Sequence, residues 1–132
     1  MWTRFMDMHS GGKLKLKPHQ YILMEAPQEE AEVIFQNRFG RNPYRVTCTC
    51  CGEDYSVGEH ETLAEATAYD RNCRWDPTTQ RYFEEGDPER TYGKYKPLEE
   101  YLKQPDVMVI RSEEIQPSER IGELRKEGYV WQ

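Results

Sequence analysis

Apolar residues recur along the chain in short runs that predict β-strands. The clearest runs are 19–26 (HQYILMEA) and 106–110 (DVMVI), both of strand length. Residues 44–49 (YRVTCT) have strand composition, and 55–57 (YSV) follow them as a returning strand. A last short strand is predicted at 129–131. The two middle segments together predict a hairpin whose tip carries cysteines.

The predicted helices repeat apolar residues with a helical period instead. Residues 28–39 place several apolar side chains on one stripe, after a proline suited to the first turn and before a glycine that stops the helix. These side chains are Ala31, Ile34, Phe35 and Phe39. A capping box, with Thr62 as the cap and Glu65 as its partner, begins a second helix over 63–73. A third helix is predicted from Pro97 to Lys103.

The segment between the second and third helices, 74–96, is rich in proline, glycine, tyrosine and charge, and we expect an irregular loop there. The alternating residues 13–17 (KLKLK) predict an edge strand or a loose arm. Strands and helices are mixed and the loops between them are long, so the expected fold class is α+β. We expect one domain over residues 1–132, with a small mixed sheet and two to three helices.

Composition limits how such a fold can be stabilised. Of the 132 residues, 36% are hydrophobic and 32% are charged, so the core is thin and a covalent or metal staple would help. No window approaches about eighteen apolar residues, and the N-terminus lacks the basic and apolar parts of a secretory signal. We therefore expect a cytoplasmic protein without membrane contact. In a reducing compartment, clustered cysteines bind metal more often than they form disulfides.

Cys48 and Cys51 form a C-x-x-C pair that is followed by Gly52. This spacing lets two thiolates meet one zinc ion at about 2.3 Å each. The glycine permits the tight turn whose amides hydrogen-bond the sulfurs. Zinc knuckles at hairpin tips are built in this way. The sequence therefore predicts a structural Zn2+ site at the tip of the 44–57 hairpin.

A closed structural zinc site needs four ligands. Cys73 lies 22 positions beyond Cys51, a usual separation between the two halves of a small zinc site. The favoured ligands are the four cysteines, Cys48, Cys50, Cys51 and Cys73. His60 and His9 are alternatives for the fourth ligand. Four thiolates would leave no coordination position for water, so the metal would be structural rather than catalytic.

A redox-active pair or free thiols are the other interpretation of these cysteines. Thioredoxin-type pairs sit at a helix N-terminus, which lowers the thiol pKa. Here Cys51 is followed by Gly-Glu-Asp, which begins no amphipathic helix and adds negative charge. Both features argue against redox chemistry.

Groups that could carry catalysis are isolated in the sequence. The chain has three histidines, none in a motif such as H-E-x-x-H, and no glycine-rich phosphate loop. The net charge of −6 is uneven, with +2 on residues 1–47 and −8 on residues 48–132. The acidic part disfavours general binding to phosphate backbones and suits a partner with a basic surface. We therefore expect a binding protein and not an enzyme.

Residues 81–101 combine tyrosines with carboxylates, as in Tyr82, Glu84, Glu85 and Tyr95. Tyrosine with negative charge is typical of a surface that docks on a basic protein groove. The alternative is that these tyrosines cover a shallow core beneath a long loop.

The segment VTCTCCGEDY, with the opening MWTRFMDMHSGG and the closing EGYVW, resembles small proteins of phages and mobile elements. In size and cysteine content the chain is similar to zinc-binding type II-A anti-CRISPR proteins. This resemblance implies a phage-type inhibitor in the cytoplasm of a bacterial host. It would bind a host defence protein, the guide-RNA-directed CRISPR nuclease, and block its DNA loading or activity by protein–protein contact, without touching nucleic acid directly.

A zinc-ribbon-like module acting on nucleic acid or in transcription is the second interpretation. It predicts a basic patch beside the knuckle. Arg41 and Arg45 are close to the knuckle in sequence, but acidic residues outnumber them. These acidic residues are Glu53, Asp54, Glu59 and Glu61.

Overall fold

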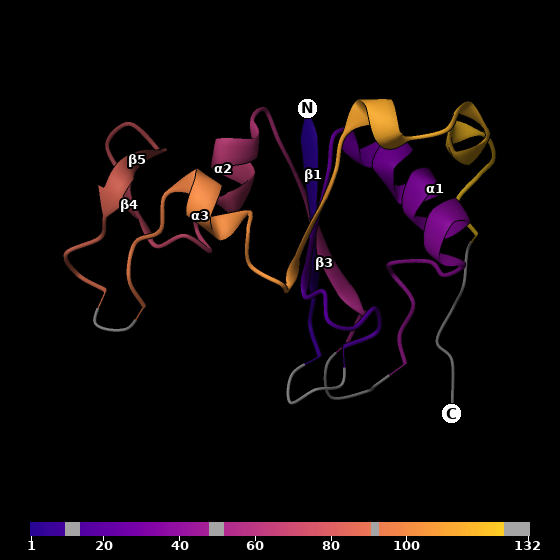
Figure 1. Ribbon diagram of the computed structural model, residues 1–132, viewed down its shortest axis with the longest axis horizontal. Helices are drawn as coiled ribbons and strands as arrows, with labels where there is room; N and C mark the ends of the chain where they lie inside the picture. Colours follow the sequence, from indigo (N-terminus) through magenta and orange to yellow (C-terminus); the bar gives the residue numbers. More distant parts are fainter. Residues whose placement is uncertain (10–13, 48–51, 91–92, 126–132) are drawn as a thin grey trace.

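A four-stranded sheet forms the centre of the structure, a computed structural model that describes residues 1–9, 14–47, 52–90 and 93–125 (Figure 1). Its strands lie in the order β3–β1–β2–β6. Their bounds are β1 Trp2–Asp7, β2 Tyr21–Met24, β3 Tyr55–His60 and β6 Val107–Ile110. β1 is antiparallel to both of its neighbours, whereas β2 and β6 are parallel. The sheet is therefore mixed, as the sequence predicted, and with its helices it confirms the α+β class.

Helix α1 (Gln28–Phe39) covers one face of this sheet (Figure 1). Its apolar stripe packs on the inward side chains of β1, β2 and β3, and the Phe5 and Phe35 ring centroids lie 4.7 Å apart. The Tyr55 ring meets the edge of Phe35 in the same core. The helix ends as predicted at Gly40, whose φ of 70° suits a residue without a Cβ.

The opposite face of the sheet carries a second, smaller core. Helices α2 (Leu63–Thr67) and α3 (Leu98–Tyr101) pack there against Trp2 and Leu23. The two cores use alternate residues of the same strands, because successive side chains point to opposite faces of a sheet. The expected capping residue is confirmed, since the Thr62 side chain accepts a hydrogen bond from the Glu65 amide.

A separate two-stranded sheet stands beside α2 and α3, at the left of Figure 1. It is the hairpin of β4 (Cys73–Asp76) and β5 (Arg81–Gly86). The Asp76 carboxylate shapes its turn by accepting hydrogen bonds from the Thr78 amide and the Thr79 hydroxyl. The expected irregular loop over 74–96 is therefore wrong for the residues of this hairpin.

Two further expectations are wrong. Residues 44–47 form no strand beyond an isolated bridge at Val46, and β3 pairs with β1 along its whole length. Residues 48 and 49 lie outside the described part of the chain, as does the strand expected at 129–131. The helix expected over 63–73 ends at Thr67, so Cys73 lies in a strand.

The described chain ends along α1. Two short 3₁₀ helices, Ser112–Glu114 and Pro117–Arg120, pack beside that helix. The Arg38 guanidinium of α1 forms an ion pair with Glu119 of the second 3₁₀ helix at 2.8 Å. None of the helices in the described ranges has the length and apolar character needed to cross a membrane.

Candidate functional site

A buried polar cluster lies where β1 ends, and His9 is at its centre. The His9 Nδ1 atom is 2.9 Å from Asp7 Oδ1, and the same oxygen accepts the His9 backbone amide at 2.8 Å. The other Asp7 oxygen accepts the Lys15 amide at 2.7 Å. His9 is only 5% exposed and Asp7 only 1%. The Asp7 carboxylate therefore orients the imidazole through Nδ1, with Nε2 on the side of the ring away from Asp7.

Asp54 faces the other side of the same imidazole. His9 Nε2 lies 3.5 Å from Asp54 Oδ1, and Nε2 makes no hydrogen bond to any described residue. Asp54 is fully buried; its Oδ1 accepts the Thr47 hydroxyl at 2.7 Å, and its Oδ2 is 3.6 Å from the Arg41 guanidinium. A buried ring nitrogen and a buried carboxylate thus face each other without a hydrogen bond between them.

The Tyr55 side chain lies between the His9 cluster and the hydrophobic core. Its hydroxyl is buried and has no hydrogen-bond partner among the described residues. Burial, and then the charges of Asp7 and Asp54, raise the pKa of Tyr55 far above its ordinary value, whereas Arg41 lowers it. The phenol is therefore neutral.

The cysteines predicted as zinc ligands are only partly described. Cys48, Cys50 and Cys51 lie outside the described residues. Cys73 begins β4, where it is 1% exposed, and burial raises the pKa of its thiol. In the described ranges, no three His, Cys, Asp or Glu side chains are grouped so that they could hold a metal ion.

The two ends of β3 separate the candidate ligands. The first residue of β3, Tyr55, pairs with Asp7, and its last residue, His60, pairs with Trp2. Six residues of strand place these ends about 17 Å apart. Thr47 and His9 contact Asp54 next to the first residue of β3, whereas His60 is its last residue. Figure 1 shows β4, which begins at Cys73, on the far side of α2, away from the first residue of β3. Of the two alternative ligands, His9 lies near the first residue of β3 and His60 is its last residue.

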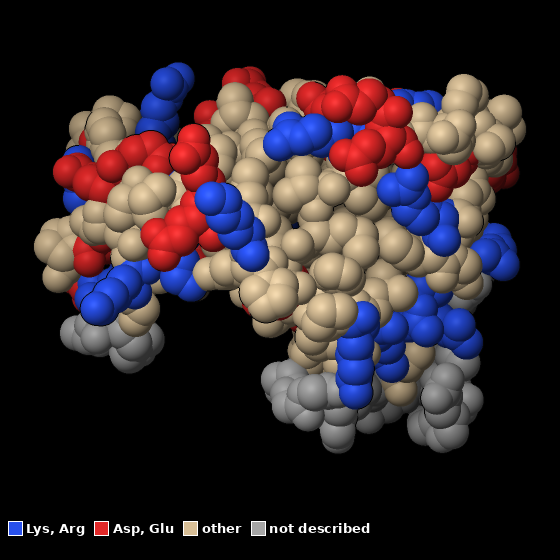
Figure 2. Space-filling view, viewed as in Figure 1, with Lys and Arg blue, Asp and Glu red and all other residues tan. Residues whose placement is uncertain are grey.

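Basic side chains surround the His9 cluster at the surface. The Arg41 guanidinium lies 3.6 Å from Asp54 Oδ2. Lys15 and Arg45 contact the cluster through their backbones, because the Lys15 amide donates to Asp7 and the Arg45 carbonyl accepts the Asp54 amide. Figure 2 shows Lys and Arg side chains gathered at this end of the molecule, at the lower right. Of the acidic residues near the knuckle in the sequence, Asp54 is buried, Glu53 is exposed, and Glu59 belongs to the other end of β3. The charge balance expected around the knuckle stays a prediction, because residues 48–51 lie outside the described part of the chain.

The β4–β5 hairpin presents large aromatic side chains to solvent. Trp75 is 44% exposed, Phe83 40%, and the neighbouring Tyr69 60%. Trp75 packs against Tyr82, with ring centroids 4.8 Å apart, on one face of the hairpin. Arg74 stacks over Phe83 on the other face, 4.5 Å from the ring centroid. Tryptophan, tyrosine and arginine dominate binding energy at protein interfaces, so this hairpin is the candidate binding surface.

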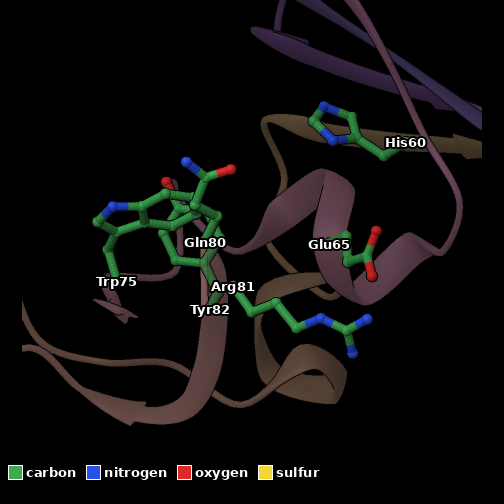
Figure 3. A pocket seen from close by; sticks show the side chains of 6 residues that line it. All are labelled: His60, Glu65, Trp75, Gln80, Arg81 and Tyr82. Carbon is green, nitrogen blue, oxygen red and sulfur yellow. The ribbon is translucent and has the colours of Figure 1, made fainter. Parts of the chain in front are cut away.

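A pocket of about 470 Å³ opens between this hairpin, α2 and the end of β3 (Figure 3). Its walls are formed by the side chains of His60, Glu65, Trp75, Gln80, Arg81 and Tyr82. Gln80, in the turn of the hairpin, adopts a φ of 55°, a conformation that favours glycine or asparagine. The pocket combines aromatic faces with both signs of charge.

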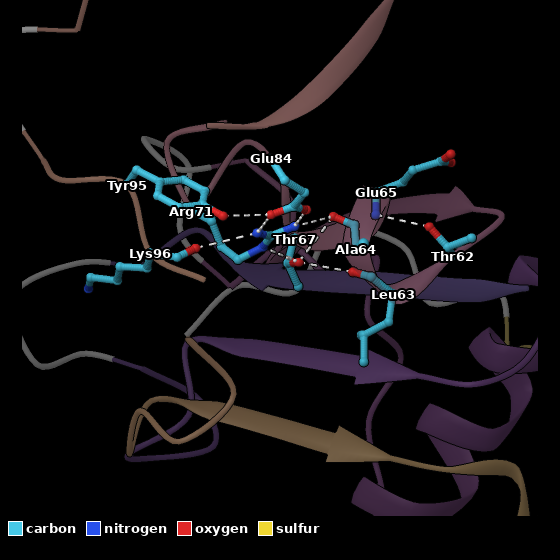
Figure 4. A network of polar contacts seen from close by, with 9 residues as sticks. All are labelled: Thr62, Leu63, Ala64, Glu65, Thr67, Arg71, Glu84, Tyr95 and Lys96. Atoms are coloured by element: carbon cyan, nitrogen blue, oxygen red, sulfur yellow. Dashed lines mark hydrogen bonds and ion pairs between the residues drawn. The ribbon is translucent and has the colours of Figure 1, made fainter. Parts of the chain in front are cut away.

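Arg71 joins the hairpin to the rest of the protein (Figure 4). Its guanidinium, which is fully buried, donates to both Glu84 oxygens and to the carbonyls of Ala64 and Lys96. The Glu84 carboxylate also accepts the Tyr95 hydroxyl at 2.9 Å. Hydrogen bonding to Arg71 holds the pKa of Glu84 below its ordinary value. One buried cation therefore connects α2, β5 and the segment before α3.

Two of the acidic residues expected to give 81–101 its character form ion pairs within the protein. Glu84 pairs with Arg71, and Glu85 pairs with Arg74 at 2.6 Å. Tyr101 is buried in the core under α3, as the alternative interpretation held, whereas Tyr95 holds Glu84. The surface of the β4–β5 hairpin is therefore characterised by its exposed aromatic side chains more than by negative charge.

Sequence reasoning missed three residues of these sites. Asp7 and Asp54 belong to the His9 cluster, and Trp75 leads the aromatic surface. The available signal was the D-x-H spacing of Asp7 and His9, because a carboxylate two residues away can reach the imidazole. The approach of Asp54 depends on the pairing of β3 with β1, which no local pattern specifies. Comparisons with family models, with curated proteins and with solved structures find no match to this chain.

Proposed function

We propose that the protein is a zinc-stabilised, non-catalytic binding protein that inhibits a host defence protein by direct contact. The observation that carries this proposal is the aromatic surface of the β4–β5 hairpin, where Trp75 and Phe83 remain exposed. An exposed group of large aromatic side chains costs solubility, and such groups mark interaction sites. The hairpin also stands apart from the main sheet, so a partner can reach both of its faces.

The proposed partner is the guide-RNA-directed nuclease of a type II-A CRISPR system. The support for this choice is the resemblance of the chain to zinc-binding anti-CRISPR proteins. The exposed arginines and carboxylates that frame the hairpin add polar contacts suited to the rim of a protein interface. Contact of this kind would block DNA loading or cleavage without any chemical step in the inhibitor.

A cleavage assay with a purified type II-A nuclease and its guide RNA tests this proposal. Increasing amounts of the wild-type protein should inhibit cleavage of a matched DNA, and Trp75→Ala with Phe83→Ala should abolish the inhibition. Ile121→Ala is the matched control, because Ile121 is 71% exposed and belongs to the opposite part of the molecule. Undiminished cleavage at saturating wild-type protein would remove this nuclease as the partner.

The basic surface around the His9 cluster favours a second candidate function, binding to nucleic acid. Lys15, Arg41 and Arg45 could contact phosphates there. Gel shifts of labelled DNA and RNA at two salt concentrations test this candidate. Salt-dependent binding that Arg45→Glu weakens, together with no inhibition of the nuclease, would favour it over the inhibitor.

A further inference from the structure

The pocket between the hairpin, α2 and the end of β3 contains two charged side chains that are left without a partner. The side chains of Arg81, at the start of β5, and Glu65, in α2, form no ion pair or hydrogen bond with any described residue. The other charged side chains of the two hairpin strands are held by ion pairs or by hydrogen bonds in the turn: Arg74, Asp76, Glu84 and Glu85. Arg81 and Glu65 are therefore available to a ligand in the pocket.

Aromatic rings form the opposite wall of the pocket. Figure 3 shows the Trp75 and Tyr82 rings together on one side, and the Glu65 carboxylate and the Arg81 guanidinium on the other side. The two ring centroids lie 4.8 Å apart at an interplanar angle of 59°, and Trp75 is 44% exposed, so part of the indole surface can stack on a ligand. A flat ring that stacks on Trp75 would thus direct its edge toward Glu65 and Arg81.

The two elements that carry these charges are connected by Arg71. Its guanidinium donates to the Ala64 carbonyl in α2, next to Glu65 in the sequence, and to Glu84 in β5. The pocket is therefore preformed, which reduces the entropic cost of binding. Its volume of about 470 Å³ lies within the range of small-molecule sites.

The charges in the pocket favour an uncharged ligand. Burial, and then the charge of Arg4, lower the pKa of His60, so this imidazole is neutral at pH 7. One carboxylate and one guanidinium remain, and a ligand with a single charge would be attracted by one of them and repelled by the other. A neutral ring with hydrogen-bond donors next to acceptors on its edge satisfies both groups.

Guanine is the nucleobase with such an edge. Its N1–H and N2–H donors lie side by side and suit the two oxygens of a carboxylate, and its O6 and N7 acceptors suit a guanidinium. Adenine offers a carboxylate only its N6 amino group, which lies between two acceptor nitrogens. We propose that the pocket binds a guanine base stacked on Trp75, with Glu65 accepting from its N–H groups and Arg81 donating to O6 and N7. This site goes beyond the proposed inhibition and does not depend on it.

Calorimetric titration of the wild-type protein with guanosine tests the site in the absence of any nuclease. We expect saturable binding, with adenosine at least about tenfold weaker and inosine, which lacks the 2-amino group, at least about fivefold weaker. No binding of guanosine, or equal binding of adenosine, would overturn the inference.

The base has two possible sources, a free guanosine nucleotide and a guanine in an unpaired strand. Titrations with guanosine monophosphate and with a short single-stranded oligonucleotide that contains one guanine distinguish them. Tighter binding of the oligonucleotide would support the unpaired strand, and equal or tighter binding of the monophosphate would support the free nucleotide.

Variants then assign the contacts. Glu65→Gln and Arg81→Met should each weaken guanosine binding at least about tenfold, and Glu65→Gln should bind inosine and guanosine almost equally. Glu61→Gln and Lys103→Met make the same changes of charge at exposed residues outside the pocket, and should leave the affinity unchanged. Circular dichroism checks that each variant is folded. Unchanged guanosine affinity in both pocket variants would overturn the inference.

Discussion

The main sheet and the β4–β5 hairpin are stabilised in different ways. The sheet buries Phe5, Phe35 and Tyr55 between itself and α1, and all three are at most 1% exposed. In the hairpin strands, by contrast, Trp75 and Phe83 remain open to solvent, and Arg71 supplies the main link to the rest of the protein. The hydrophobic effect stabilises the first region, and buried hydrogen bonds to one cation position the second.

This difference indicates a division of roles. Buried aromatic contacts resist change, because each substitution leaves a cavity. A surface that is positioned by polar contacts can keep its large apolar groups available to a partner. We expect substitutions in the two regions to separate stability from binding, and the following experiments test that separation.

The largest loss of stability should come from the core of the main sheet. Phe35→Ala removes a fully buried ring that stacks on Phe5 and meets the edges of Phe39 and Tyr55. We expect it to lower the free energy of unfolding by about 3–5 kcal/mol, measured by urea denaturation. The exposed Ile121→Ala should change it by less than about 0.5 kcal/mol. Equal losses for the two would show that the packing of this core contributes little.

Removal of the Arg71 guanidinium should have the next largest effect. Arg71→Met keeps the apolar stem but leaves the carbonyls of Ala64 and Lys96 without this donor, at a cost of about 2–3 kcal/mol. Limited proteolysis should then cut within 76–90 faster than in the wild type. Glu84→Gln should cost less than about 1 kcal/mol, because Glu84 is 54% exposed. If proteolysis spares the hairpin in Arg71→Met, other contacts position it.

The sequence predicted the parts of the fold whose pattern is local. Helix α1, its Gly40 stop, β2 and β6 follow from apolar periodicity and capping residues. The β4–β5 hairpin was missed because β5 buries no side chain fully and therefore has no alternation to detect. β1 was missed because its sequence, WTRFMD, mixes charged and apolar residues, although the strand lies at the centre of the sheet.

The candidate site was predictable only in part. The C-x-x-C pair and His9 were predicted as ligands from spacing and residue type; the pair lies outside the described residues, and His9 lies in the buried cluster. The buried carboxylate of Asp54 was counted as a surface charge, because burial of an acidic residue depends on partners that only the tertiary fold supplies. The place of Cys73 in a strand followed from the early end of α2, which no glycine or proline marks.

A smaller effect on stability should follow from the titration of His60 at the pocket wall. Burial, and then the charge of Arg4, lower the pKa of this imidazole below 6.5, although nearby carboxylates such as Glu65 raise it. The unfolded chain therefore takes up this proton first as the pH falls. Stability should be complete above pH 6.5 and decline as the pH falls toward the lower pKa of the folded state.

Melting temperatures between about pH 7.5 and 5.5 measure this effect, with each variant compared at every pH. His60→Gln removes the titrating group at the same wall of the pocket, so its melting temperature should fall less over this range than that of the wild type. Parallel curves for the two proteins would show that His60 does not contribute to the pH dependence.

The smallest effect on stability, and the largest on binding, should come from Trp75. Its indole is 44% exposed, so Trp75→Ala should change the free energy of unfolding by only about 0.5 kcal/mol. The same substitution should weaken inhibition of the nuclease at least tenfold, or about 1.4 kcal/mol, because buried aromatic anchors dominate interface energies. Phe83→Ala, on the opposite face of the hairpin, shows which face the partner covers. Inhibition unchanged by both substitutions would remove the hairpin from the interface and leave the basic surface beside His9 as the binding region.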